Sequence, residues 1–156
     1  AILILHDRGL LSLNDDIRKH LSELPAYGHV IRIRDLLQHT SGLPDYMSFE
    51  NFDAKHGDYW TNEDYLQQFA KQHDAFPLRF QPRAKYEYNN SNYMLAACLV
   101  ERVSKKPFAQ FMREEVFLPA GMNNSFVCNS RRPKRGDNQS TAVGYLLQDN
   151  QWAAMW

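Results

Sequence analysis

The chain has 156 residues, which suits one domain and leaves little room for two. Its 18 basic and 18 acidic side chains cancel and are interspersed, so the charge pattern indicates neither a nucleic acid nor an anionic membrane as a partner. No apolar run approaches the roughly 20 residues that a membrane span needs, and we expect no membrane segment in this chain.

The first nine residues, AILILHDRG, have the character of the last turns of a helix. They are apolar from the first position, and too few positive charges precede them for a signal peptide. Gly9 can end such a helix in the left-handed conformation. We therefore expect the chain to be a fragment whose first helix begins upstream of Ala1.

Two short helices are expected next. Acidic residues in a first turn and apolar residues spaced along one face predict a helix over 15–23, which Pro25 ends. The apolar residues Ile33, Leu36 and Leu37 predict a second short helix. The pattern thus indicates two small helical elements before residue 40.

The second of these helices ends at the segment HTSGLP, residues 39–44. Gly42 can take a positive φ there, and Pro44 blocks any continuation of the helix. The aromatic-rich stretch 45–60 has no sustained period, so we expect a loop packed down by its own side chains. Loops of this kind often line a cleft.

Two longer helices have clearer signals. Thr61 and Asp64 resemble a capping box ahead of a helix predicted over 62–72. Apolar residues at helical spacing predict a second helix over 92–104. Cys98 lies on the apolar face of that helix and is expected to be an inert core residue.

The last third of the chain contains one more predicted helix and a possible hairpin. Pro107 suits a first helical turn, and the helix that it opens is expected to end near Phe117. Residues 142–147 and 151–156 flank turn residues and are interpreted as two strands, although only the first has convincing β character.

The stretch 80–93, FQPRAKYEYNNSNY, concentrates polar and aromatic groups just before the helix over 92–104. Tyr88 and Asn90 are two residues apart on a loop entering that helix, so both can point into one cleft while Asn89 points away. We therefore expect the replacement of Asn89 by Ala to be mild. Asn90 or Ser91 can cap the helix, because a side-chain oxygen there can accept from a backbone N–H further on. The pattern predicts a site at the start of the helix.

Taken together, four segments resemble the serine β-lactamase-related family, which includes class C β-lactamases, D,D-peptidases and related esterases: GLLSLNDDI, IRDLLQHTSGLPDY, FQPRAKYEYNNSNYMLAACLVERVSKKPF and FLPAGMNNS. The resemblance implies an α/β fold with an inserted helical region. We therefore expect a mainly α fragment, the helical region of that fold, with a possible short hairpin at the C-terminal end. On this interpretation residues 1–156 form a partial domain that lacks the N-terminal nucleophile segment and the C-terminal sheet.

The resemblance also implies a chemistry. Family members carry a nucleophilic Ser and a Lys in Ser-x-x-Lys, a Tyr-x-Asn motif, and a third motif on a sheet strand. Tyr88 and Asn90 match the second motif and are the expected catalytic residues. The other two motifs are absent from this sequence and would lie upstream of Ala1 and beyond Trp156. Because a phenol is a weak base at neutral pH, Tyr88 needs a nearby cation, which would be the missing lysine.

The segment after HTSGLP is expected to reach the cleft. Asp45 and Tyr46 are the candidate substrate-binding residues, although Tyr46 can equally be packed under the following loop. Ser41 lies two residues from His39, but proximity in sequence does not make a triad, and we expect Ser41 to be structural and His39 to be an orienting residue. The histidines show no zinc-ligand spacing, so no metal or cofactor is expected.

One position departs from the family pattern. The family usually has Gly after the Pro of the Phe-x-Pro loop, where this chain has Arg83. If that position requires a positive φ, Arg costs about 1 kcal/mol or more relative to Gly.

Two functions remain open from the sequence. The first is part of a serine hydrolase that cleaves an amide or ester in a small-molecule or peptide substrate through an acyl-enzyme, with this chain inactive by itself. The second is a non-catalytic helical binding or scaffold module. The resemblance implies a periplasmic or secreted location.

Overall fold

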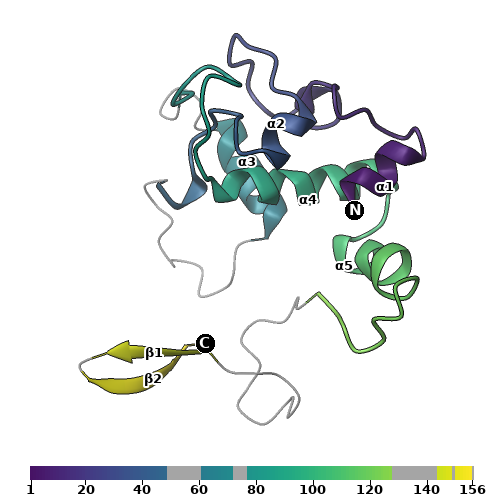
Figure 1. The fold of residues 1–156 in the computed structure, drawn as a ribbon. Helices are drawn as coiled ribbons and strands as arrows, with labels where there is room; N and C mark the ends of the chain where they lie inside the picture. Colours follow the sequence, from purple (N-terminus) through teal and green to yellow (C-terminus); the bar gives the residue numbers. More distant parts are fainter. Residues whose placement is uncertain (49–60, 72–76, 128–143, 149, 156) are drawn as a thin grey trace.

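A computed structural model describes residues 1–48, 61–71, 77–127, 144–148 and 150–155 (Figure 1). Within these residues the chain is mostly helical and ends in a two-stranded antiparallel hairpin, as the sequence predicted. The α-helices are α1 (Ile2–Asp7), α2 (Ile33–Leu37), α3 (Asn62–Lys71), α4 (Asn90–Ser104) and α5 (Phe108–Met112). Single turns of tighter or wider helix occur at Ile17–Lys19, Tyr46–Ser48 and Arg113–Phe117, and the strands are β1 (Gly144–Gln148) and β2 (Gln151–Met155).

Helix α4 lies at the centre of the helical region, with α1, α2, α3 and α5 packed against it (Figure 1). Every residue from Met94 to Val100 is buried, because neighbouring helices cover α4 on several sides along this stretch. Burial raises the pKa of the Cys98 thiol to about 12, so this cysteine is an inert core residue, as expected. The hydrophobic core therefore surrounds the middle of α4, directly after the polar residues at the start of the helix.

The ends of two helices confirm the sequence signals. Gly9 has φ +69, and Leu10 donates its backbone N–H to the Leu5 carbonyl, which ends α1 with a left-handed glycine. At the start of α3, Thr61 and Asp64 exchange side-chain to backbone hydrogen bonds of 2.7 and 3.2 Å.

The helix predicted over 15–23 is wrong, since only Ile17–Lys19 form a single 3₁₀ turn. The backbone of this segment bonds instead to the chain just before α2. Ile17 donates to the Ile31 carbonyl at 2.9 Å, and Ile33 donates to the Asp15 carbonyl at 3.1 Å. Backbone groups used in these tertiary bonds cannot also close helical turns.

The hairpin confirms both predicted strands, including the second one. Leu147 pairs with Trp152, and Asn150 takes φ +62 in the turn. The hairpin lies apart from the helices in Figure 1. Among the hairpin residues whose side chains the structure describes, Tyr145, Leu146, Leu147 and Trp152 are exposed. None of the helices described is long and apolar enough to cross a membrane.

The segment 39–42 is clamped to the loop 79–87 by backbone hydrogen bonds. Arg79 donates to the Gly42 carbonyl at 2.8 Å, and Glu87 donates to the His39 carbonyl at 2.9 Å. Gly42 has φ +76, and a β-carbon there would overlap the backbone of Phe80. This close approach brings the HTSGLP segment and the Tyr-x-Asn loop together.

Candidate active site

The start of α4 is capped by Asn89, and this corrects two expectations. Asn89 Oδ1 accepts from the Ser91 backbone N–H at 2.7 Å, so Asn89 is the cap rather than Asn90 or Ser91. Its side-chain amide donates to the Leu43 carbonyl at 2.5 Å, and the residue is buried. Asn89 does lie on the opposite side from Tyr88 and Asn90, but that side is the interior of the protein.

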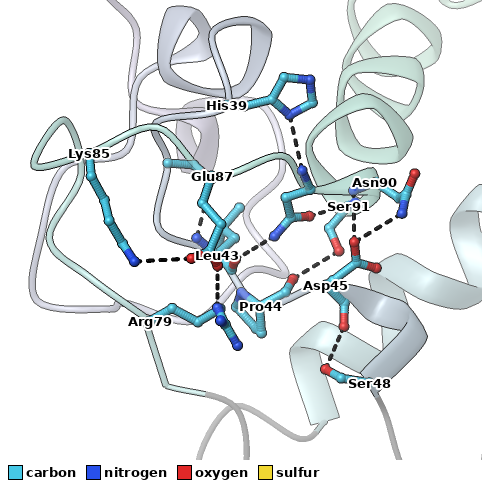
Figure 2. Close-up of polar contacts among 12 residues, drawn as sticks. His39, Leu43, Pro44, Asp45, Ser48, Arg79, Lys85, Glu87, Asn90 and Ser91 are labelled. Atoms are coloured by element: carbon cyan, nitrogen blue, oxygen red, sulfur yellow. Dashed lines mark hydrogen bonds and ion pairs between the residues drawn. The ribbon is translucent and has the colours of Figure 1, made fainter.

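Asp45 holds Asn90 in place. One carboxylate oxygen of Asp45 accepts from the Asn90 backbone N–H at 2.9 Å and from the Asn90 side-chain amide at 3.0 Å (Figure 2). The other oxygen accepts from the Met47 backbone N–H at 3.0 Å. A carboxylate at this position also complements the positive end of the α4 dipole. Asp45 therefore fixes which way the Asn90 amide points, and its expected part in substrate binding stays a prediction.

The structure brings Tyr88 and Asn90 together. The Tyr88 hydroxyl donates to Asn90 Oδ1 at 3.2 Å. Because Asp45 takes the amide end of Asn90, the carbonyl end is left for Tyr88. Tyr88 is 64% exposed in this chain, so its phenol is accessible to a substrate or to further protein.

Tyr46 combines packing with a position close to the pair. Its backbone N–H donates to Ser91 Oγ at 2.8 Å, and its ring lies 4.3 Å from that of Tyr65. Burial raises the pKa of Tyr46, with smaller contributions from Asp45 and Tyr88. Half-buried between the core and the Tyr88 side of the site, the ring is compatible with both of its expected roles.

Ser41 is buried beneath the site. Its hydroxyl donates to Asn92 Oδ1 at 2.6 Å and accepts from the Leu43 backbone N–H at 3.2 Å. The Ser41 residue is 1% exposed, and the hydrogen bonds of its hydroxyl go to Asn92 and Leu43 rather than to His39. This geometry is structural, as the sequence led us to expect.

Arg83 has the positive φ that the family pattern indicated, at +72°. Its guanidinium forms an ion pair of 2.6 Å with Asp35, whose side chain is 1% exposed. Asp35 also accepts from the Arg32 backbone N–H at the start of α2. The ion pair joins the Tyr-x-Asn loop to α2 and offsets part of the backbone strain at Arg83.

Sequence reasoning missed the inward-facing Asn89 and the partner role of Asn92. Both belong to the run NNSN at 89–92, where polar residues stand directly before an apolar stretch. Such a run indicates buried polar groups that need partners. Among the residues described, no cluster of three or more His, Cys, Asp or Glu side chains could hold a metal ion.

Comparisons with known proteins find relatives that match nearly the whole chain. A family model described as Beta-lactamase matches residues 1–154. Penicillin-binding protein 4* of Bacillus subtilis (strain 168) is 36% identical to the chain over 149 residues, which are 94% of this chain and 31% of that protein. The chain thus spans about a third of the length of this curated relative.

Solved structures of other proteins are also similar to this chain. The crystal structure of a penicillin binding protein from Bacillus halodurans superposes with a TM-score of 0.76 at 28% identity, covering 98% of this chain and 45% of that one. A D-amino acid amidase from Ochrobactrum anthropi SV3, complexed with L-phenylalanine amide, superposes with a TM-score of 0.60 at 29% identity, covering 77% of this chain and 32% of that one.

Proposed function

Since the chain belongs to the beta-lactamase family, we propose that it forms the helical part of a serine hydrolase that cleaves an amide or ester through an acyl-enzyme. The observation that carries this proposal is the contact between the Tyr88 hydroxyl and Asn90 Oδ1, held at the start of α4 by Asp45. These two groups have the chemistry needed to relay a proton and to orient a substrate amide.

The nucleophile and its lysine come from outside these residues. No serine in the sequence is followed by a lysine three residues later. The serine hydroxyl attacks the carbonyl carbon and its proton passes to the Lys and Tyr88 pair, after which the same proton goes to the leaving amine or alcohol. Water then hydrolyses the acyl-enzyme and regenerates the serine. In this scheme residues 1–156 are a partial domain and are inactive by themselves.

Asn90 has the capacity to serve two partners at once. Its Oδ1 has two lone pairs, of which the Tyr88 hydroxyl uses one. The second lone pair is available to the lysine ammonium, which would bring the cation next to the phenol. A cation at that position favours the anionic form of Tyr88, so a larger fraction of the phenol is deprotonated at neutral pH and able to act as the base.

Asp45 and Tyr46 take different parts in this proposal. Asp45 acts on the substrate through Asn90, since its carboxylate is already engaged with the Asn90 and Met47 amides. Tyr46 lines the site beside Asp45 and contacts the acyl side chain of the substrate. Replacing Tyr46 with Ala in the full-length protein should change the relative rates on small and large acyl groups, and unchanged ratios would show a packing role alone.

The names of the relatives indicate different ligands or substrates, so the substrate of this protein has to be identified by testing several classes. We expect a β-lactam, a D-Ala-D-Ala peptide or a small ester to acylate the full-length protein. The test is intact-protein mass spectrometry after separate incubations with a penicillin, with a peptide that ends in D-Ala-D-Ala and with a nitrophenyl ester. A covalent adduct on a serine outside residues 1–156, with hydrolysis on a longer incubation, supports the proposal.

The isolated chain of 156 residues is the matched control, and it should give neither an adduct nor turnover. A full-length protein that forms no adduct with any of the three substrate classes would favour the alternative, a non-catalytic helical binding or scaffold module. Turnover by the isolated chain that disappears in Ser41→Ala would overturn the placement of the nucleophile.

A further inference from the structure

His39 lies directly against the proposed catalytic phenol. Its imidazole centroid is 4.7 Å from the Tyr88 ring centre and 5.2 Å from the Tyr93 ring centre, with the Tyr86 ring edge-on at 6.0 Å. The Tyr93 hydroxyl donates to the Leu37 carbonyl at 3.2 Å, which ties this ring to the end of α2. The imidazole is thus a fixed surface on which the exposed Tyr88 ring rests.

The tautomer of His39 follows from one backbone group. The Asn89 backbone N–H can only donate, and it points at His39 Nδ1 at 3.2 Å. Nδ1 therefore carries no proton, and the ring proton is on Nε2. The Asn92 side chain, 3.2 Å from the same nitrogen, must then present its amide N–H to it.

The same orientation of Asn92 also assigns the donors and acceptors in the remaining hydrogen bonds around His39. With its N–H groups turned to His39, Asn92 presents Oδ1 to Ser41, and the Ser41 hydroxyl donates to it at 2.6 Å. Ser41 in turn accepts from the Leu43 backbone N–H. The Asn89 backbone N–H and the Asn92 amide both point at the lone pair of Nδ1, and that lone pair is present only when His39 is neutral.

From this geometry we propose that His39 is a positioning residue for the hydrolase chemistry, a neutral imidazole that holds the Tyr88 ring in its reactive orientation. The inference rests on the proposed function, because it assigns a role through Tyr88. His39 contributes no positive charge to the phenol, so the activating cation comes from elsewhere. The ring acts by contact, and the Nδ1 acceptor acts by fixing the start of α4.

One substitution separates these two contributions. In His39→Asn, the Asn Oδ1 occupies the place of Nδ1 and can still accept from Asn89, while the ring beneath Tyr88 is removed. Asn also tolerates the positive φ of this position, which is +55°. The variant should therefore fold with a thermal midpoint close to that of the wild type. His29→Asn, at an exposed histidine, is the matched control.

The expected result in the full-length protein is a roughly 2- to 10-fold fall in kcat with KM unchanged, the size of one aromatic contact expressed as a rate ratio. In a Tyr88→Phe background, His39→Asn should give no further fall, because the ring acts only through the phenol. Nitrogen NMR of the wild-type imidazole should show the proton on Nε2 and none on Nδ1.

The outcomes that overturn the proposal are distinct from failure of the proposed function. Wild-type kcat in His39→Asn, an equal loss in the Tyr88→Phe background, or a protonated Nδ1 would each remove the positioning role while leaving the hydrolase intact. A loss of kcat that only follows a loss of folded protein would assign His39 to stability alone. Full activity in Tyr88→Phe would overturn the proposed function and this inference together.

Discussion

Replacing Gly42 with Ala should disrupt the link between the HTSGLP segment and the Tyr-x-Asn loop. Gly42 has φ +76, where an L side chain costs about 1 kcal/mol. The added β-carbon would also overlap the Phe80 carbonyl oxygen and lie 3.1 Å from its carbonyl carbon, so the two backbones must separate. That separation breaks the Arg79 to Gly42 hydrogen bond and strains its neighbours, each worth about 1 kcal/mol.

The expected loss in the free energy of unfolding is therefore about 3 kcal/mol, measured by guanidinium titration of the full-length protein. Turnover should fall as well, because the loop that moves carries Tyr88. Gly28→Ala is the control, since Gly28 has φ +72 with no atom within 4 Å of the added β-carbon, and it should cost only about 1 kcal/mol. Equal losses for the two variants would refute the close backbone approach as the reason for glycine at position 42.

Two further predictions concern stability. Asn89→Ala should lower the free energy of unfolding by about 2 to 4 kcal/mol, because it removes the α4 cap and leaves the Leu43 carbonyl unpaired in the interior. A loss below about 0.5 kcal/mol in a urea titration would contradict the role of Asn89 as a buried cap. Hydrogen bonds from the Ser12 backbone and His20 hold the pKa of Asp15 far below its ordinary value. The stability that the Asp15 carboxylate contributes is therefore complete above its pKa in the unfolded chain, about 4, and is lost as the pH falls below that value. The difference in thermal midpoint between the wild type and Asp15→Asn should accordingly shrink between pH 6 and pH 2, and a difference independent of pH would show that the carboxylate charge is not involved.

Local signals were sufficient to predict the longer elements. The helix predicted over 62–72 is found at Asn62–Lys71, because the capping box at its start is a purely local interaction. The helix predicted over 92–104 is found at Asn90–Ser104, with the difference of two residues arising at the cap. Most of the loop predicted over 45–60 lies outside the residues described.

Interactions between distant segments account for what the sequence missed. The helix predicted over 15–23 does not form because backbone groups in this segment bond to residues 31–34, and no local sequence pattern predicts such pairing. Asn89 was expected to be tolerant of substitution because it faces away from Tyr88, yet the opposite side of that loop is occupied by the Leu43 carbonyl. Knowing this requires the position of the HTSGLP segment, which lies more than forty residues earlier in the chain.

The candidate site was predicted in part. The resemblance indicated Tyr88 and Asn90, and the structure places them in contact. The part played by Asp45 in holding Asn90 was not predicted, because a carboxylate just after a proline turn does not indicate which helix start it will reach. The fixed tautomer of His39 likewise depends on a backbone N–H from a distant segment.

The most direct test of the central claim compares two tyrosines on the same loop. Tyr88→Phe removes a hydroxyl that donates to Asn90, whereas Tyr86→Phe removes a hydroxyl from a similarly exposed ring that also contacts His39. The measurement is kcat/KM of the full-length protein on a nitrophenyl ester, with thermal unfolding as the check on folding. We predict a fall of roughly 10² to 10⁴ for Tyr88→Phe and almost none for Tyr86→Phe. Equal activity of Tyr88→Phe and the wild type would remove the phenol from the mechanism.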